Sequence, residues 1–183
     1  DTNVESLEII NHSWNAVKLN NKWYLCDATW SSGYFFGTIF IEDYNLGYFL
    51  TEPTLFAKNH IPKDKKWLLN ETLINSEYSV APIVYGETFK HKTLPISPQN
   101  MHVKLKKGEH LNFSFKTLDS IDINKVSLLQ FVGINPIDFE INNLKEDNGM
   151  VSFSTTFKHK GFYDVHLAID DDVVATYTVK VTK

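Results

Sequence analysis

Cysteine is the scarcest reactive residue in this chain of 183 residues, because Cys26 is the only one. A single thiol excludes an internal disulfide framework and leaves the redox compartment open. No segment approaches the roughly 20 consecutive apolar residues of a membrane-spanning helix, and no signal peptide is recognisable. Hydrophobic residues nevertheless make up 43% of the chain and aromatic residues 14%. The composition therefore predicts a soluble protein with one large or two small globular domains.

Positive charge is also sparse, since the formal net charge is −4 and the basic residues are scattered. The densest basic group is Lys63, Lys65 and Lys66. Its position directly after Pro62 is typical of a solvated loop rather than of an anion site. The sequence therefore argues against nucleic acid as a partner.

A tight β-hairpin is predicted near the N-terminus. Two runs with strand-compatible side chains, residues 13–19 and 22–27, flank the pair Asn20-Asn21. Asparagine tolerates the positive φ angles that a two-residue hairpin turn requires. In such a hairpin Leu19 faces Lys22, and each further step along one strand is matched by one step back along the other.

This register brings a histidine and a carboxylate to one face. Trp14 faces Asp27, and His12 lies diagonally from Asp27, about 7–8 Å away and within reach of long side chains. Cys26 points to the opposite face, whereas a slip of one residue would turn it toward His12. A histidine oriented by a carboxylate is the acid/base half of a catalytic triad. His12 and Asp27 are therefore the candidate catalytic residues.

The residues around this pair form two blocks in a definite order. The first block has His12, Trp14-Asn15, the hairpin and then Asp-Ala-Thr-Trp at residues 27–30. The second block consists of Tyr48-Phe49-Leu50-Thr51, Pro53, Phe56, His60, Pro62, Asp64 and Trp67-Leu68-Leu69. Over about residues 9–70 the chain thus resembles the cysteine peptidase-like branch of the transglutaminase-like superfamily.

The resemblance implies a Cys-His-Asp triad in which His12 is the histidine and Asp27 the aspartate. It implies no cofactor and no metal, and a peptide or protein as substrate. In the family the nucleophilic cysteine precedes the histidine at the start of a helix, but none of the eleven residues before His12 is cysteine. Cys26 occupies an ordinary strand position and does not inherit that role. Without a thiol on the His12 face, this chain alone is expected to be inactive.

Three explanations account for the missing nucleophile. The chain is the C-terminal part of a longer enzyme, or it pairs with a separate N-terminal fragment that supplies the cysteine, or its parent is a degenerate, non-catalytic member. We expect the first. Asp1 is not an initiator methionine, and a hairpin so near the start would lack its neighbouring strands and covering helices.

Two segments follow the hairpin. Residues 31–47 contain three glycines and five aromatic residues, which predicts a long loop rather than a regular element. Whether that loop lines a cleft or packs in a core is open. Glu52 and Pro53 then suit the first turn of a short helix, which Pro62 interrupts.

After about residue 79 the pattern becomes that of a β-sandwich. Strand-like runs appear at 83–85, 101–105, 111–115, 126–132, 139–141, 151–157, 163–169 and 173–181, separated by turn residues such as Asn135-Pro136. The predicted fold class is therefore α+β followed by all-β. The resemblance implies that residues 1–78 are the C-terminal part of a papain-like, transglutaminase-like domain, and the strand pattern predicts that residues 79–183 form an immunoglobulin-like sandwich of about 100 residues.

The second domain offers no catalytic group by sequence. Its histidines lack metal-ligand spacing. The run Asp170-Asp171-Asp172 suits a polar hairpin turn better than a calcium site. A spacing, docking or binding role is expected for it.

Two functions follow from these observations. The first is a fragment of a transglutaminase-like cysteine peptidase or acyltransferase; hydrolysis and transamidation share an acyl-enzyme and are not separated, although the family branch favours a peptidase. The second is a non-catalytic binding or scaffolding module of a surface or cytoskeletal protein. The composition and the attached sandwich associate the protein with an extracellular or bacterial envelope location.

Overall fold

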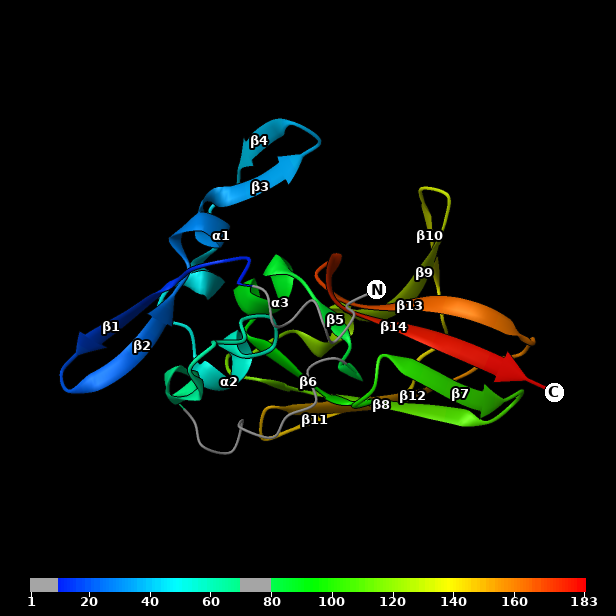
Figure 1. Cartoon of the computed structure of the whole chain (residues 1–183). Helices are drawn as coiled ribbons and strands as arrows, with labels where there is room; N and C mark the ends of the chain where they lie inside the picture. Colours follow the sequence, from blue (N-terminus) through cyan, green and yellow to red (C-terminus); the bar gives the residue numbers. More distant parts are fainter. Residues whose placement is uncertain (1–9, 70–79) are drawn as a thin grey trace. The chain divides into compact units, whose positions relative to one another are not determined.

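The computed structural model describes residues 10–69 and 80–183, which form two compact units divided between Ser79 and Val80. Each unit is described by itself (Figure 1). The described residues are mostly in antiparallel β-sheets, and their helices are short. None of the described helices is long and apolar enough to cross a membrane.

The first unit begins with the hairpin of β1 (Asn15–Leu19) and β2 (Lys22–Cys26). The strands are antiparallel, and Leu19 faces Lys22. Asn20 and Asn21 both have left-handed backbones, with φ of 48° and 63°, as a two-residue turn of this type requires. The observed register is the predicted one. It follows from the two-residue turn, which sets which residues of the two strands face each other.

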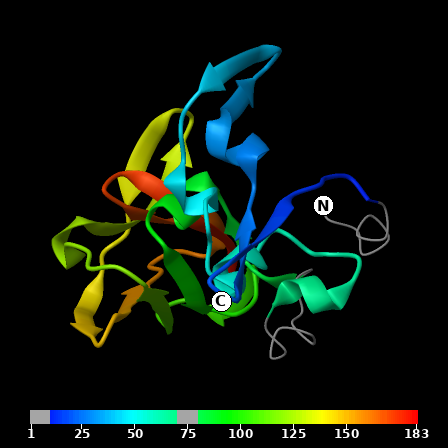
Figure 2. The same ribbon diagram turned by 90° about the vertical axis from the view of Figure 1, so that its left-hand side faces the viewer.

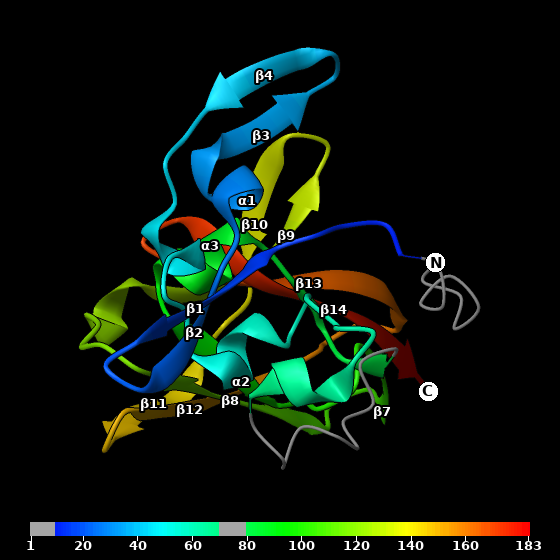
Figure 3. The same cartoon turned by 60° about the vertical axis from the view of Figure 1, so that its left-hand side comes forward.

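Helix α1 (Ala28–Ser32) follows directly and leads into a second hairpin of β3 (Gly33–Phe36) and β4 (Ile39–Glu42). Figures 2 and 3 show these two strands side by side beyond α1. The prediction of an irregular loop over 31–47 is therefore wrong. Aromatic and β-branched side chains favour pairing, and Gly37 supplies a positive φ of 62° at the turn.

The described residues of the first unit after β4 contain three short helical segments and a β-bridge between Thr51 and Leu25. The helical segments are a 3-10 helix at Leu46–Tyr48, α2 (Pro53–Phe56) and a 3-10 helix at Lys65–Leu68. Glu52 precedes α2 and Pro53 is its first residue, which confirms the predicted helix start. A papain-like α+β domain is not seen in residues 10–69, so that part of the fold class stays a prediction.

The second unit consists of two sheets. The first has the order β11-β12-β8-β6, and the second has the order β10-β9-β13-β14-β5, with β7 parallel to β14. Their bounds are β5 Ile83–Val84, β6 Thr93–Ser97, β7 His102–Lys106, β8 His110–Thr117, β9 Val126–Val132, β10 Asn135–Asp138, β11 Asn142–Asp147, β12 Met150–Thr156, β13 Gly161–Ile169 and β14 Asp172–Thr182. Helix α3 (Gly86–Lys90) and a 3-10 helix at Ile123–Lys125 complete the unit.

One hydrophobic core is built from buried side chains of both sheets. Figure 3 shows the backbones of β8 and β14, which belong to different sheets. Phe113 of β8 stacks on Phe153 of β12, and Tyr177 of β14 meets Phe113 edge-on, each at 5.3 Å between ring centres. The order β6-β8-β12-β11 against β9-β13-β14 is that of an immunoglobulin-type sandwich. The predicted sandwich architecture is thus found.

The strand prediction is wrong in several places, and it contains no run at β6 or at β11. Residues 139–141 lie between β10 and β11 instead of forming a strand, and Asn135-Pro136 lies in β10 rather than in a turn. The turn is made by Gly133, with φ of 64°. Pro136 is tolerated because β10 is an edge strand.

Tyr177 provides a test of the sandwich core. Its hydroxyl is buried and has no hydrogen-bond partner among the described residues, and burial raises the pKa of that hydroxyl. Replacing Tyr177 by phenylalanine removes the unpaired group and keeps the ring. We expect the free energy of unfolding, measured by guanidinium denaturation with far-UV circular dichroism, to rise by about 1 kcal/mol.

The matched control is Tyr163→Phe. The Tyr163 hydroxyl donates to the carbonyl oxygen of His159 at 2.8 Å, so its removal is expected to lower the free energy of unfolding by about 0.5–1 kcal/mol. A larger loss for Tyr177→Phe than for Tyr163→Phe would contradict the assignment of Tyr177 as an unpaired core hydroxyl.

Candidate functional site

Asp27 is held firmly at the junction between β2 and α1. It is the N-cap of α1, and its Oδ1 accepts a hydrogen bond from the backbone N–H of Trp30 at 2.9 Å. Its own backbone N–H donates to the carbonyl oxygen of Tyr48 at 2.9 Å. The side chain is 1% exposed. These contacts leave Oδ2 as the oxygen available for other partners.

His12 contacts that oxygen. Its Nε2 lies 2.5 Å from Oδ2 of Asp27, so the structure brings the two predicted residues together. The His12 side chain is 23% exposed, and its ring stacks on Trp30 with 5.3 Å between ring centres. One side of the imidazole is thus held by Asp27 while part of the ring reaches solvent.

His60 is a third member of the site that sequence reasoning did not identify. Its Nε2 lies 2.9 Å from the same Oδ2 of Asp27, and its side chain is 1% exposed. The ring stacks on Phe56 at 3.9 Å between ring centres and meets Trp14 edge-on at 5.1 Å. His60 belongs to the second block of the family resemblance, and membership of that block was the sequence signal available for it.

Both ring nitrogens of His60 face oxygen atoms. While Nε2 faces Asp27, Nδ1 lies 2.6 Å from Oδ1 of Asn59. A neutral imidazole has only one N–H to donate. Burial lowers the pKa of His60, although the hydrogen bond and the charge of Asp27 act in the opposite direction. A neutral His60 can therefore satisfy only one of the two oxygens by hydrogen bonding.

The contacts also set the charge state of Asp27. Burial alone would raise the pKa of the Asp27 carboxyl group, but hydrogen bonds from the Trp30 N–H, His60 and His12 together bring the pKa below its usual value. Asp27 is accordingly ionised at neutral pH, and it can orient an imidazole and stabilise its positive charge.

Cys26 lies on the other face of the hairpin, as predicted. It is buried, and its Sγ accepts a hydrogen bond from the backbone N–H of Leu50 at 3.3 Å. Since Cys26 is the only cysteine of the chain, the residues of the first unit offer His12 no thiol partner. The site can move protons but has no nucleophilic sulfur of its own.

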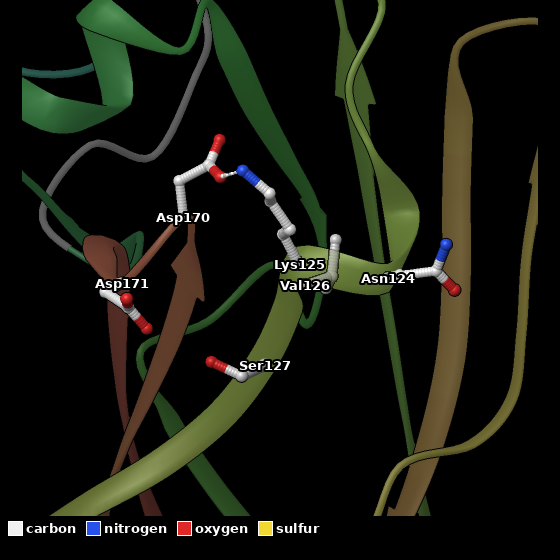
Figure 4. Close-up of a pocket in the computed structure, with 6 residues that line it drawn as sticks. All are labelled: Asn124, Lys125, Val126, Ser127, Asp170 and Asp171. Atoms are coloured by element: carbon white, nitrogen blue, oxygen red, sulfur yellow. Dashed lines mark ion pairs between the residues drawn. The ribbon is translucent and has the colours of Figure 1, made fainter.

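The second unit contains an open pocket of about 430 Å³ around Asn124, Lys125, Val126, Ser127, Asp170 and Asp171 (Figure 4). Lys125 Nζ pairs with Oδ1 of Asp170 at 2.5 Å. The charge of the Asp170 carboxylate is thus balanced by a lysine of the chain itself. Asp170 and Asp171 have positive φ angles of 53° and 69°. They form the turn between β13 and β14, which confirms the predicted polar hairpin.

The described residues thus define a class of molecule: an immunoglobulin-type sandwich in the same chain as a buried aspartate with two histidines. No protein-family model matches the chain. Over 60 residues it is 48% identical to kyphoscoliosis peptidase of Mus musculus, and over 61 residues it is 49% identical to kyphoscoliosis peptidase of Homo sapiens. Each match covers 32% of this chain and 9% of the relative, so the chain matches less than a tenth of those proteins' length. The similarity supports the transglutaminase-like resemblance for that stretch.

Solved structures give weaker similarities. The filamin domain of Lin-41 aligns with a TM-score of 0.38 and 10% identity, over 56% of this chain and 97% of that domain. The M1 domain of titin aligns with a TM-score of 0.24 and 14% identity, over 45% of this chain and 86% of that domain. The fold assignment of the second unit therefore rests on its strand order.

The environment of Cys26 makes a direct prediction about reactivity. We expect its reaction with Ellman's reagent in the native chain to be at least about tenfold slower than in denaturant, because the sulfur is buried and not activated. His12→Ala should leave the native rate unchanged. A native rate that falls in His12→Ala would show instead that the thiol faces His12, as in the slipped register.

Asp27 should be the most important polar residue of the first unit for stability. Asp27→Ala removes a helix cap and leaves two histidines without their acceptor, so we expect a loss of about 3 kcal/mol in the free energy of unfolding. All four tryptophans lie in residues 14–67, so tryptophan fluorescence reports on this unit during guanidinium denaturation.

Asp64 supplies the control for this measurement. It also caps a short helix, by accepting from the Lys66 N–H at 3.2 Å, but its side chain is 55% exposed. Asp64→Ala is expected to cause a clearly smaller loss than Asp27→Ala. Equal losses would mean that Asp27 acts only as a helix cap.

Proposed function

We propose that the first unit supplies the histidine and the aspartate of a Cys-His-Asp triad in a transglutaminase-like cysteine peptidase. His12 is the general base and acid, and Asp27 orients it. The nucleophilic thiol comes from outside this chain, either from a preceding segment of the parent protein or from a separate polypeptide. The local similarity to kyphoscoliosis peptidase supports this reaction class.

The contact between His12 and Asp27 is the observation that carries the proposal. Because Asp27 takes Nε2 of His12 at 2.5 Å, Nδ1 is the nitrogen left to exchange a proton with a nucleophile. Among the described residues Nδ1 has no hydrogen-bond partner, and the ring is 23% exposed. A buried, ionised aspartate on one side and an accessible nitrogen on the other are what a general base requires.

The proposed chemistry follows from this arrangement. Nδ1 of His12 takes the proton of the external thiol, and the thiolate attacks the carbonyl carbon of a peptide or side-chain amide. The carbon–nitrogen bond then breaks, and the imidazolium returns the proton to the leaving amine. The acyl-enzyme is resolved by water in a peptidase and by an amine in a transamidase. We favour the peptidase, because the resembling branch and the matched relative are named so.

The position of Cys26 favours a second candidate function. Its sulfur is buried and hydrogen-bonded on the face away from His12, so this chain lacks a triad of its own. A parent without an external cysteine would be a binding or scaffolding module, in which the His12–Asp27 contact is structural and the sandwich provides the binding surface.

Thiol alkylation of the full-length gene product separates the two functions. For the peptidase we expect one cysteine outside this chain to react with iodoacetamide at mildly acidic pH at least about tenfold faster than an ordinary thiol, because a neighbouring imidazole keeps it ionised. His12→Ala should abolish this advantage. Peptide mapping by mass spectrometry identifies the modified residue.

The control variant is His91→Ala. His91 also contacts an aspartate, with its Nε2 at 2.8 Å from Oδ2 of Asp172, but it lies in the second unit. Its replacement should leave the alkylation rate unchanged. A full-length protein in which every cysteine reacts as an ordinary thiol, with or without His12, would reject the peptidase and favour the scaffolding module.

A further inference from the structure

Three potential metal-ligand atoms converge in the first unit. They are a ring nitrogen of His12, a carboxylate oxygen of Asp27 and a ring nitrogen of His60, all within 4.8 Å of one another. Nε2 of each histidine lies within 2.9 Å of Oδ2 of Asp27. The residues come from three separate places: the segment before β1, the N-cap of α1 and the segment after α2. Two imidazole nitrogens and one carboxylate oxygen are a common ligand set for zinc, with a further position open to water.

The surroundings of His60 suit coordination better than hydrogen bonding alone. Oδ1 of Asn59 and Oδ2 of Asp27 lie on opposite sides of its ring, at 2.6 and 2.9 Å from Nδ1 and Nε2. A cation between Nε2 and Asp27 resolves this arrangement. Nδ1–H then donates to Asn59, and the lone pair of Nε2 points at the ion, which is the outer-shell pattern of metal-bound histidines.

Asp27 and its neighbours are also arranged as a metal site requires. The Trp30 N–H holds Oδ1 at 2.9 Å and so fixes the carboxylate with Oδ2 toward both histidines. The rings of Trp14, Trp30 and Phe56 pack against the histidines. Apolar surroundings strengthen the attraction between an ion and a carboxylate. The exposed part of His12 is the side from which an ion and a water molecule can enter.

We propose that His12, Asp27 and His60 bind one divalent transition-metal ion, for which Zn²⁺ is the best fit. Binding itself does not depend on the peptidase chemistry. A further consequence does rest on the proposed function: with Nε2 of His12 on the ion, the ring proton stays on Nδ1, and no lone pair remains there to accept a thiol proton. Zinc would therefore inhibit such an enzyme reversibly.

Calorimetric titration of Zn²⁺ into the metal-stripped chain tests the site directly. We expect one ion per chain. His60→Gln and His12→Gln should each weaken binding by at least about 100-fold, because removing a ligand is more severe than the 10–100-fold loss seen for outer-shell partners. Co²⁺ serves as a second probe, because its visible absorption in the chain should show a tetrahedral or five-coordinate ion and should be lost in the same variants.

His91→Gln is the matched control, because His91 contacts Asp172 at 2.8 Å without a second histidine in the described metal-ligand group. It should bind Zn²⁺ as the parent chain does. Asn59→Ala should weaken binding by about tenfold through the outer shell. Circular dichroism and tryptophan fluorescence show whether each variant is folded. If His60→Gln unfolds, zinc binding by His12→Gln tests the site, because His12 is more exposed and its replacement disturbs the fold less.

The proposal is overturned if the chain binds no ion in a one-to-one ratio, or if the folded His12→Gln variant binds as tightly as the parent. A reversed Asn59 amide would then account for the contacts of His60. Thiol alkylation in the full-length protein is read separately, so failure of zinc binding leaves the peptidase proposal intact, and the converse also holds.

Discussion

The organisation of the first unit depends on a single oxygen atom, Oδ2 of Asp27, which lies within hydrogen-bonding distance of two histidines. A buried carboxylate is costly unless it is hydrogen-bonded and paired. The Trp30 N–H and both imidazoles meet that requirement. Because Asp27 also begins α1 and joins the Tyr48 backbone, the same residue connects the β1–β2 hairpin, the helix and the segment after α2.

The sandwich of the second unit is stabilised in another way. Its core is built from apolar side chains of both sheets, and Phe113, Phe153 and Tyr177 are at its centre. Its ion pairs, such as Lys125–Asp170, lie at the surface and contribute little to stability. The interactions that hold the two regions therefore differ. Buried apolar side chains stabilise the sandwich, whereas hydrogen bonds to a buried carboxylate hold the candidate site together.

This difference explains what the sequence could predict. The register of β1 and β2 follows from Asn20-Asn21, because a local turn determines the whole ladder. The sandwich follows from alternating side chains, although Pro136 misled the assignment of β10, since an edge strand tolerates proline. The β3–β4 hairpin does not follow from the sequence, because its glycines are equally typical of an irregular loop. His60 was missed as a site residue because 33 positions separate it from Asp27, and no local pattern reports such a contact.

The two histidines differ in exposure, and our proposals give them different roles for that reason. His60 is enclosed by Phe56, Trp14 and Asn59, so a substrate does not reach it, and in our proposals it positions Asp27 or holds an ion. His12 has the same acceptor but keeps an accessible nitrogen. The shared carboxylate can therefore contact either N–H groups or a metal ion. With a proton on Nε2 of both histidines, it supports a general base at Nδ1 of His12. With a metal ion bound to Nε2, the ring proton of His12 lies on Nδ1, and the general base is lost. The geometry around Asp27 thus supports both proposals, a general base at His12 and a zinc site that would take that base away.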